Sequence, residues 1–278
     1  MNILITGSNG FIATELINRF EKENWVTKIF KLSRQNSNLL DFEETQKIFN
    51  NNKIDFVIHC AISGGRRGMM EDPKMFYDNV AMFENLASQR HKFKGMINFG
   101  SGAEAERTKG IMIMKEEQFL SDKQIPSDYY GFSKYMIAKR IQQINDNIYN
   151  FRIFNVFGEL EKENRMIKNN INRYKAGKPL EIHQNKTMDF FSAEDLYRVI
   201  RYYIKNCMFL LDKDINMCYI NKVDLKQICS IIGCDSNPKI VFNCDGMAPA
   251  YCGNGMRLKK LKIDLVGLEG SIESLMEK

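Results

Sequence analysis

Apolar residues in the first half of the chain alternate between short continuous runs and longer amphipathic stretches. The short runs, rich in β-branched and aromatic residues, occupy residues 2–6, 26–33, 55–62, 95–101 and 150–158. Helical spacing of apolar residues predicts helices at 12–24, 41–52, 73–87 and 128–145. Because continuous apolar runs are typical of parallel strands buried on both faces, we predict a doubly wound α/β domain with right-handed crossovers.

The alternation changes after residue 158. Helical patterns at 165–177 and 192–206 flank a short strand at 179–183, and weaker elements follow at 215–221, 224–233, 239–243 and 271–277. We therefore expect a Rossmann domain formed by residues 1–157 with a return segment at about 186–206. Residues 158–185 and 207–278 are expected to form a smaller, mixed α/β lobe that binds the substrate.

Composition limits the class of protein. A hydrophobic content of 44% and a charged content of 27% are those of a soluble globular protein, and no apolar run reaches the ~18 residues that a membrane span needs. The start, MNILITG, lacks the basic region of a secretory leader, so we expect a cytoplasmic protein. The net charge of +6 is dispersed, which favours small polyanions over nucleic acid as partners.

Cysteine usage gives no sign of a metal centre. The seven cysteines contain no Cys-x-x-Cys pair, and none of the three histidines lies near the closely spaced Cys229, Cys234, Cys244 and Cys252. We predict free thiols and no metal site.

A glycine turn joins the first predicted strand to the first helix. Gly7, Gly10 and Ala13 form the pattern Gly-x-x-Gly-x-x-Ala. Glycines let the backbone approach a pyrophosphate, whose charge the helix N-terminus stabilises. In this position the turn predicts a dinucleotide site.

The end of the second strand indicates which dinucleotide is bound. An NAD site usually carries an acidic residue there for the ribose hydroxyls, whereas this chain has Ser33 and Arg34. A guanidinium can bind a 2′-phosphate, which favours NADP, with NAD as the alternative.

Tyrosine and lysine four residues apart can form a proton-donating pair or merely share a helix face. The pattern occurs at Tyr130–Lys134, Tyr135–Lys139 and Tyr174–Lys178. The pattern alone does not select among them.

Six segments together resemble the extended branch of the short-chain dehydrogenase/reductase superfamily, which contains nucleotide-sugar epimerases, dehydratases and reductases. They are TGSNGFI, VIHCA, FGS, YGFSK, RIFNVFG and MDFFSAEDL, in family order over nearly the whole chain. The resemblance selects Tyr130 as general acid, Lys134 as its partner on the nicotinamide ribose, and Ser101 as a second contact to the reacting oxygen. Lys134 is also expected to lower the pKa of the Tyr130 phenol.

The same resemblance implies further binding residues. Expected cofactor contacts are Gly7, Ser8, Gly10, Phe11, Ile12, Ser33, Arg34, Asn38, Leu39, Cys60, Ala61, Ile62, Asn79, Phe99, Tyr130, Lys134 and Phe154. Expected substrate contacts are Ser101, Asn155, Arg165, Lys186 and Arg257. His59 is expected to pack within its strand.

Departures from the family pattern narrow the reaction. Glu104 stands one place later than the acidic pair of the 4,6-dehydratases, and Ala103 replaces the cysteine of the epimerase–reductases that make fucose nucleotides. Met188 stands where the family often has an arginine for the substrate pyrophosphate. The resemblance then implies an NADPH-dependent reductase of a nucleoside-diphosphate 4-keto-6-deoxy sugar, active as a homodimer. An NAD-dependent 4-epimerase is the alternative, and a non-catalytic dinucleotide sensor is a third possibility.

Overall fold

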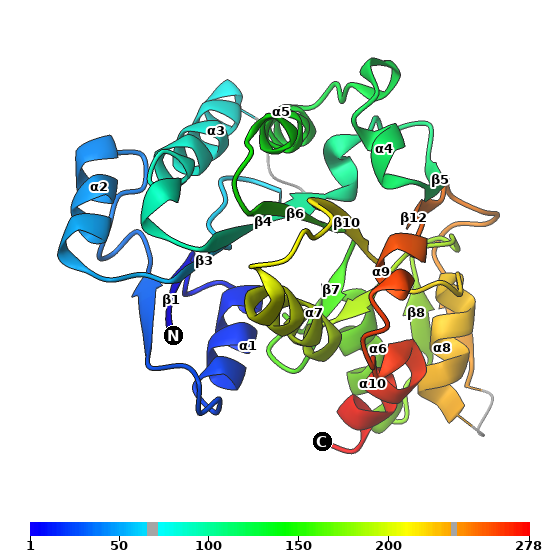
Figure 1. The fold of residues 1–278 in the computed structure, drawn as a ribbon. Coiled ribbons are helices and arrows are strands. Elements are labelled where there is room, and N and C mark those ends of the chain that lie inside the picture. Colours follow the sequence, from blue (N-terminus) through cyan, green and yellow to red (C-terminus); the bar gives the residue numbers. More distant parts are fainter. Residues whose placement is uncertain (66–71, 235–237) are drawn as a thin grey trace.

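A six-stranded parallel sheet forms the centre of the protein, seen in a computed structural model that describes residues 1–65, 72–234 and 238–278 (Figure 1). Its strand order is β10-β6-β4-β3-β1-β2. The strands are β1 (Asn2–Thr6), β2 (Lys28–Leu32), β3 (Phe56–His59), β4 (Gly95–Ser101), β6 (Ile148–Ile153) and β10 (Asp214–Met217). This confirms the predicted doubly wound sheet, in which the order reverses between β1 and β3.

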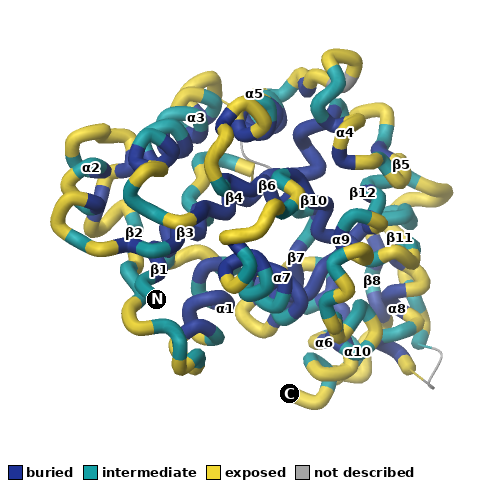
Figure 2. The backbone as a smooth tube through the Cα atoms, viewed as in Figure 1, coloured by how far each residue is buried: buried dark blue, intermediate teal, exposed yellow. Residues whose placement is uncertain are grey.

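Helices cover both faces of the sheet (Figure 1). On one face lie α2 (Phe42–Asn51), α3 (Pro73–Ala87) and α5 (Tyr129–Gln143). On the other face lie α1 (Phe11–Phe20) and α7 (Ala193–Asn206). Each face of the sheet has its own apolar core, and successive residues of β1 point into opposite cores. Ile3 and Ile5 pack with α1 and α7, and Leu4 packs with α2, α3 and α5. The central strands are therefore buried along their length, as Figure 2 shows.

A smaller lobe has its own apolar core. It contains α6 (Met166–Lys175), β8 (Leu180–Ile182), α8 (Leu225–Gly233), β11 (Ile240–Phe242) and α10 (Gly267–Met276). The short strands β7 (Val156–Phe157) and β9 (Phe191–Ser192) pair beside it. One boundary expectation is wrong: β10, assigned from sequence to this lobe, pairs with β6 at the edge of the main sheet.

The segment between β4 and α5 contains elements that the sequence pattern did not indicate. They are the 3₁₀ helix η2 (Gly102–Glu104), β5 (Ile111–Met114), α4 (Glu116–Phe119) and the 3₁₀ helix η3 (Asp122–Gln124). β5 pairs with β12 (Tyr251–Gly253), which precedes α9 (Met256–Lys260). A further 3₁₀ helix, η1 (Arg90–Lys92), precedes β4. The pairing of β12 with β5 brings a C-terminal strand next to η2, at the carboxyl end of β4.

Candidate active site

The turn from β1 to α1 has the geometry of a phosphate-binding loop. Gly7 has a φ of 62°, and a Cβ built on it would lie 2.8 Å from the backbone of Ala61. Gly10 is the N-cap of α1 and offers no side chain to the N–H groups of the first turn. These N–H groups and the helix dipole favour an anion at this point, so the predicted loop fits a dinucleotide pyrophosphate.

Thr6 ties the ends of β1 and β3 together beneath this loop. Its hydroxyl accepts a hydrogen bond from the Ala61 N–H at 3.1 Å and lies 2.8 Å from Nδ1 of His59. Burial, and secondly the charge of Lys134, lower the pKa of His59 to about 3. His59 packs within its strand, as expected.

Four expected cofactor contacts, Ser33, Arg34, Asn38 and Leu39, follow the end of β2. Ser33 accepts from the Gln35 N–H, and the Asn38 N–H donates to Glu44. Leu39 is buried in the core, whereas the side chain of Arg34 is exposed. An exposed guanidinium at this edge is accessible to a phosphate.

Ser101, Tyr130 and Lys134 come together at the carboxyl end of β4. Ser101 ends that strand, and the other two lie in the first turns of α5, where Asp128 caps the helix by accepting from the Gly131 N–H. The Tyr130 phenol lies close enough to Ser101 for the serine to influence its pKa. The trio selected by the family resemblance is thus a contiguous cluster.

Tyr135 and Lys139, the second tyrosine–lysine pair four residues apart, lie against Asp122 and not in this cluster. The Tyr135 hydroxyl donates to Asp122 at 2.8 Å, and Nζ of Lys139 lies 2.9 Å from the same carboxylate. This pair anchors η3 to α5 and has a structural role.

Burial raises the pKa of Tyr130, and the nearby Ser101 side chain and the charge of Arg107 oppose that rise. The sequence analysis predicts that Lys134 lowers the pKa of Tyr130, whereas Ser101 and Arg107 have this effect in the structure. The phenol therefore keeps its proton at neutral pH, the form that a general acid requires. Arg107, which also pairs with Asp128 at 3.1 Å, was not recognised from the sequence.

Lys134 is held by the sheet rather than by a carboxylate. Nζ donates to the carbonyl oxygen of Phe99 at 2.7 Å, and burial lowers the pKa of the ammonium to about 8. Nζ makes no second hydrogen bond to residues 1–65, 72–234 or 238–278, which leaves two N–H donors for a ligand. Asn79 binds the backbone of Ser63 at 2.8 and 3.0 Å and donates to Ser133 at 3.1 Å, so it links the loop after β3 to α5.

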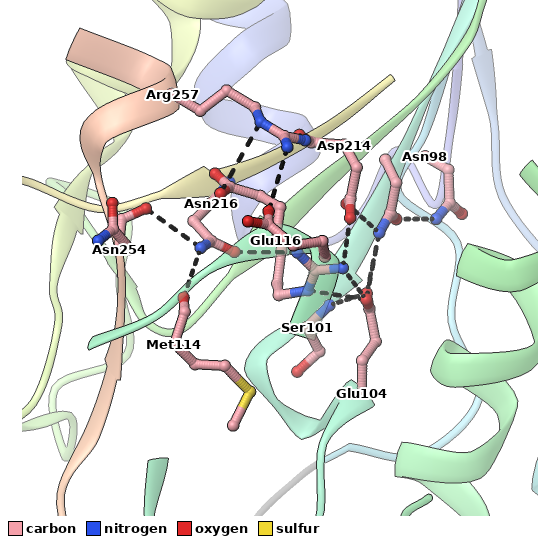
Figure 3. Close-up of polar contacts among 12 residues, drawn as sticks. Asn98, Ser101, Glu104, Met114, Glu116, Asp214, Asn216, Asn254 and Arg257 are labelled. Atoms are coloured by element: carbon pink, nitrogen blue, oxygen red, sulfur yellow. Dashed lines mark hydrogen bonds and ion pairs between the residues drawn. The ribbon is translucent and has the colours of Figure 1, made fainter. Parts of the chain in front are cut away.

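A buried polar network lies behind Ser101 (Figure 3). Oε1 of Glu104 accepts from the Ser101 N–H at 2.9 Å, and Oε2 accepts from the fully buried Arg152. Arg152 also donates to Asp214 and Asn216, each at 2.9 Å. Glu104 therefore fixes the backbone of Ser101, a role that its position in the sequence did not reveal.

The expected substrate residues divide into two groups. Asn155 donates to the carbonyl oxygen of Asp189 at 2.9 Å, and its own carbonyl lies 3.4 Å from a guanidinium nitrogen of Arg165. A buried ion pair between Asp189 and Lys222, at 2.7 Å, adjoins them and was not anticipated.

Lys186 and Arg257, the other expected substrate residues, make contacts apart from Asn155 and Arg165. The backbone carbonyl of Lys186 accepts from the Leu225 N–H at the edge of α8. Arg257 donates to the Asp214 carbonyl at 2.8 Å and to Glu117 at 3.3 Å, on the opposite side of the Glu104 network from Ser101 in Figure 3. These contacts give Arg257 a role in joining α9 to α4 and β10.

Two other features of the described residues concern partners. No cluster of three or more histidine, cysteine, aspartate or glutamate side chains within residues 1–65, 72–234 and 238–278 could hold a metal ion. No helix in those ranges combines the length and the apolar character needed to cross a bilayer.

A family model for the NAD dependent epimerase/dehydratase family matches residues 3–218, from the first strand to the last of the main sheet. The chain belongs to this family. No curated protein sequence matches it.

Solved structures of the NAD dependent epimerase/dehydratase type have the same fold. The GDP-mannoheptose C4 reductase of Campylobacter jejuni, solved with NADP, has a TM-score of 0.81 at 18% identity, with 99% of this chain and 97% of that chain covered. A GDP-L-fucose synthetase of Naegleria fowleri has a TM-score of 0.77 at 18% identity, with coverage of 99% and 91%. The UDP-glucose 4-epimerase of Thermus thermophilus, solved with NAD, has a TM-score of 0.74 at 16% identity, with coverage of 100% and 98%.

Proposed function

We propose that this protein is an NADPH-dependent reductase that converts the 4-keto group of a nucleoside-diphosphate 4-keto-6-deoxy sugar into a hydroxyl. The observation that carries the proposal is the cluster of Ser101 at the end of β4 with Tyr130 and Lys134 of α5, in which burial keeps the phenol protonated. Similarity in fold to the GDP-mannoheptose C4 reductase supports the same class of reaction.

The cofactor would lie along the carboxyl edge of β1, β3 and β4. The loop at Gly7 and the N-terminus of α1 would hold the pyrophosphate, and Arg34 the 2′-phosphate. Lys134 would direct its two remaining N–H donors at the hydroxyls of the nicotinamide ribose. Bound there, the reduced nicotinamide supplies a hydride for the carbonyl carbon.

The protein's own groups act on the carbonyl oxygen. Tyr130 gives its proton to that oxygen as negative charge develops there. Ser101 donates a hydrogen bond to the same oxygen, which stabilises the developing charge. Asn155 and Arg165, in the opening next to the smaller lobe, would contact the nucleotide-linked part of the substrate.

The test is oxidation of NADPH, followed by its absorbance, with a panel of nucleotide-linked 4-keto-6-deoxy sugars. Wild type should oxidise NADPH in proportion to the ketosugar supplied, and Tyr130→Phe should lose the activity. Tyr135→Phe, the matched change in the second pattern pair, should keep it. Absence of oxidation with every ketosugar would reject the reductase.

A 4-epimerase is the second candidate, because the Thermus thermophilus epimerase has the same fold. It would retain NAD through purification and interconvert a complete nucleotide sugar without net consumption of cofactor. Analysis of the nucleotide released from the denatured protein distinguishes the two reactions.

The protein is also proposed to act as a homodimer. The outer surface between α3 and α5 is a groove whose apolar lining includes Phe76, Val80 and the 41% exposed Met136, together with the polar residues Glu84, Lys139, Arg140 and Gln143. Apolar side chains gathered on two adjacent helices suit a second copy of the chain. The molar mass in solution tests this.

A further inference from the structure

A second phenol reaches the catalytic serine from the C-terminal part of the chain. Tyr251 begins β12, and its hydroxyl lies beside Gly102, the residue after Ser101, close enough to the serine side chain to interact with it. No feature of the sequence had pointed to it, because about 150 residues separate it from Ser101.

The position of Tyr251 is fixed on three sides. Its N–H donates to the carbonyl oxygen of Thr187 at 2.9 Å, and its own carbonyl accepts from the Asp189 N–H at 3.1 Å. Its ring packs edge-on against Phe154 with a centroid distance of 5.2 Å. A Cβ added to Gly102 would lie 2.6 Å from the Tyr251 hydroxyl, so a glycine beside Ser101 makes room for this phenol.

The hydrogen-bonding capacity of Ser101 determines what the second phenol can do. A serine hydroxyl has one proton to donate and two lone pairs to accept with. The Ala103 N–H occupies one lone pair at 3.1 Å. During reduction, both the Ser101 proton and the Tyr130 proton are directed at the substrate oxygen. One lone pair of Ser101 then remains, and it faces a phenol that can donate.

We propose that Tyr251 is a positioning residue that donates its hydroxyl proton to Ser101 and thereby directs the serine proton at the substrate carbonyl oxygen. This role rests on the proposed reductase function. Without the Tyr251 donor, the serine hydroxyl rotates among alternative acceptors, and its contact with the developing oxyanion weakens. Burial raises the pKa of Tyr251, so the phenol retains the proton that this role requires.

The kinetic test is a double-mutant cycle of Tyr251→Phe and Ser101→Ala, measured as NADPH oxidation with the ketosugar. The phenylalanine keeps the ring packing against Phe154 and removes only the hydroxyl. Tyr251→Phe should lower kcat by about tenfold or more with KM changed less than about twofold, and it should cause no further loss in the Ser101→Ala background. Tyr203→Phe, which removes a buried phenol bonded to the Asp212 carbonyl behind the sheet, is the matched control and should retain wild-type kcat.

Wild-type kcat in Tyr251→Phe would overturn the proposal. So would losses that multiply in the double variant, because Tyr251 would then act independently of Ser101.

A second readout needs no substrate. With carbon-13 at the tyrosine Cζ, the Tyr251 resonance is identified by its disappearance in Tyr251→Phe. It should shift in Ser101→Ala, while the Tyr203 resonance stays in place. An unmoved Tyr251 resonance would overturn the proposal whatever reaction the protein catalyses. If wild type reduces no ketosugar, the proposed function fails, and the resonance alone decides whether the Tyr251–Ser101 contact exists.

Discussion

Replacing Arg152 by methionine should destabilise the protein severely, because this arginine is fully buried with its charged partners. Its guanidinium donates to Glu104, Asp214 and Asn216, and it lies 4.1 Å from the centre of the Phe119 ring. Arg152 and Glu104 have 0% exposed side chains, and Asp214 has 4%. Methionine has a similar unbranched shape, so the change removes the charge and its hydrogen bonds while leaving a small cavity.

The magnitude follows from the two carboxylates that lose their cation. Breaking a buried ion pair by removing one partner typically costs about 3–5 kcal/mol, because an uncompensated charge stays buried. Arg90→Met is the matched control, since Arg90 pairs with Asp146 where both side chains are about half exposed. Its loss should cost less than about 1 kcal/mol.

The penalty should also depend on pH. Burial raises the pKa of Glu104, the charge of Arg152 opposes that rise, and Asp214 adds to it. Without Arg152, the pKa of Glu104 in the folded protein lies further above its value in the unfolded chain. The folded variant therefore binds a proton at Glu104 at pH values where the unfolded chain has lost it. Stability therefore falls as pH rises through the raised pKa, and the variant should lose more at about pH 8 than at about pH 5.

The assay is urea unfolding followed by circular dichroism and by fluorescence of Trp25, the single tryptophan. With a slope of roughly 3 kcal/mol per molar urea, the variant midpoint should fall by roughly 1 to 1.7 M. A shift no larger than that of Arg90→Met, or a penalty that shrinks as pH rises, would refute this account of the network.

Two further predictions concern the cofactor. Since the pKa of Lys134 is lowered to about 8, its ammonium is lost as pH rises through that value, and dinucleotide affinity measured by calorimetry should weaken between about pH 7 and pH 9. Lys134→Met should abolish this dependence and Lys139→Met should preserve it; the same pH dependence in Lys134→Met would contradict the assignment. Arg34→Gln should reduce the preference for NADPH over NADH by about tenfold or more, because the 2′-phosphate loses a charge-assisted hydrogen bond. An unchanged ratio of the two dissociation constants would show that Arg34 does not bind the phosphate.

Local patterns were sufficient for β1, β2, β3, β4 and β6 of the main sheet. The run at residues 95–101 predicted β4 with the same bounds, and the glycine turn predicted the loop between β1 and α1. Both are encoded locally, the first by continuous apolar residues and the second by turn chemistry. The helix predicted at 128–145 likewise starts one residue after its Asp128 cap.

Elements stabilised by distant partners were missed. β5 lacks a strong pattern of its own, and its strand partner is β12, about 140 residues later. β10 is too short to reveal from sequence whether it joins the main sheet or the smaller lobe, and its pairing with β6 decides this. Glu104 was noted as misplaced for a dehydratase, but only the packing of β6 and β10 shows that its partner is Arg152.

The sequence by itself determined the parallel sheet, the dinucleotide loop and the trio of Ser101, Tyr130 and Lys134, because each depends on spacing within one strand, turn or helix, or on a recognisable family segment. Only the tertiary structure decided what surrounds those groups: the carboxylate of Glu104 on the serine backbone, the Phe99 carbonyl on the lysine and the Tyr251 phenol beside Gly102, next to the serine. Such contacts join residues far apart in the chain. They are set by which strands pair and which side chains are buried together, and no local pattern carries that information.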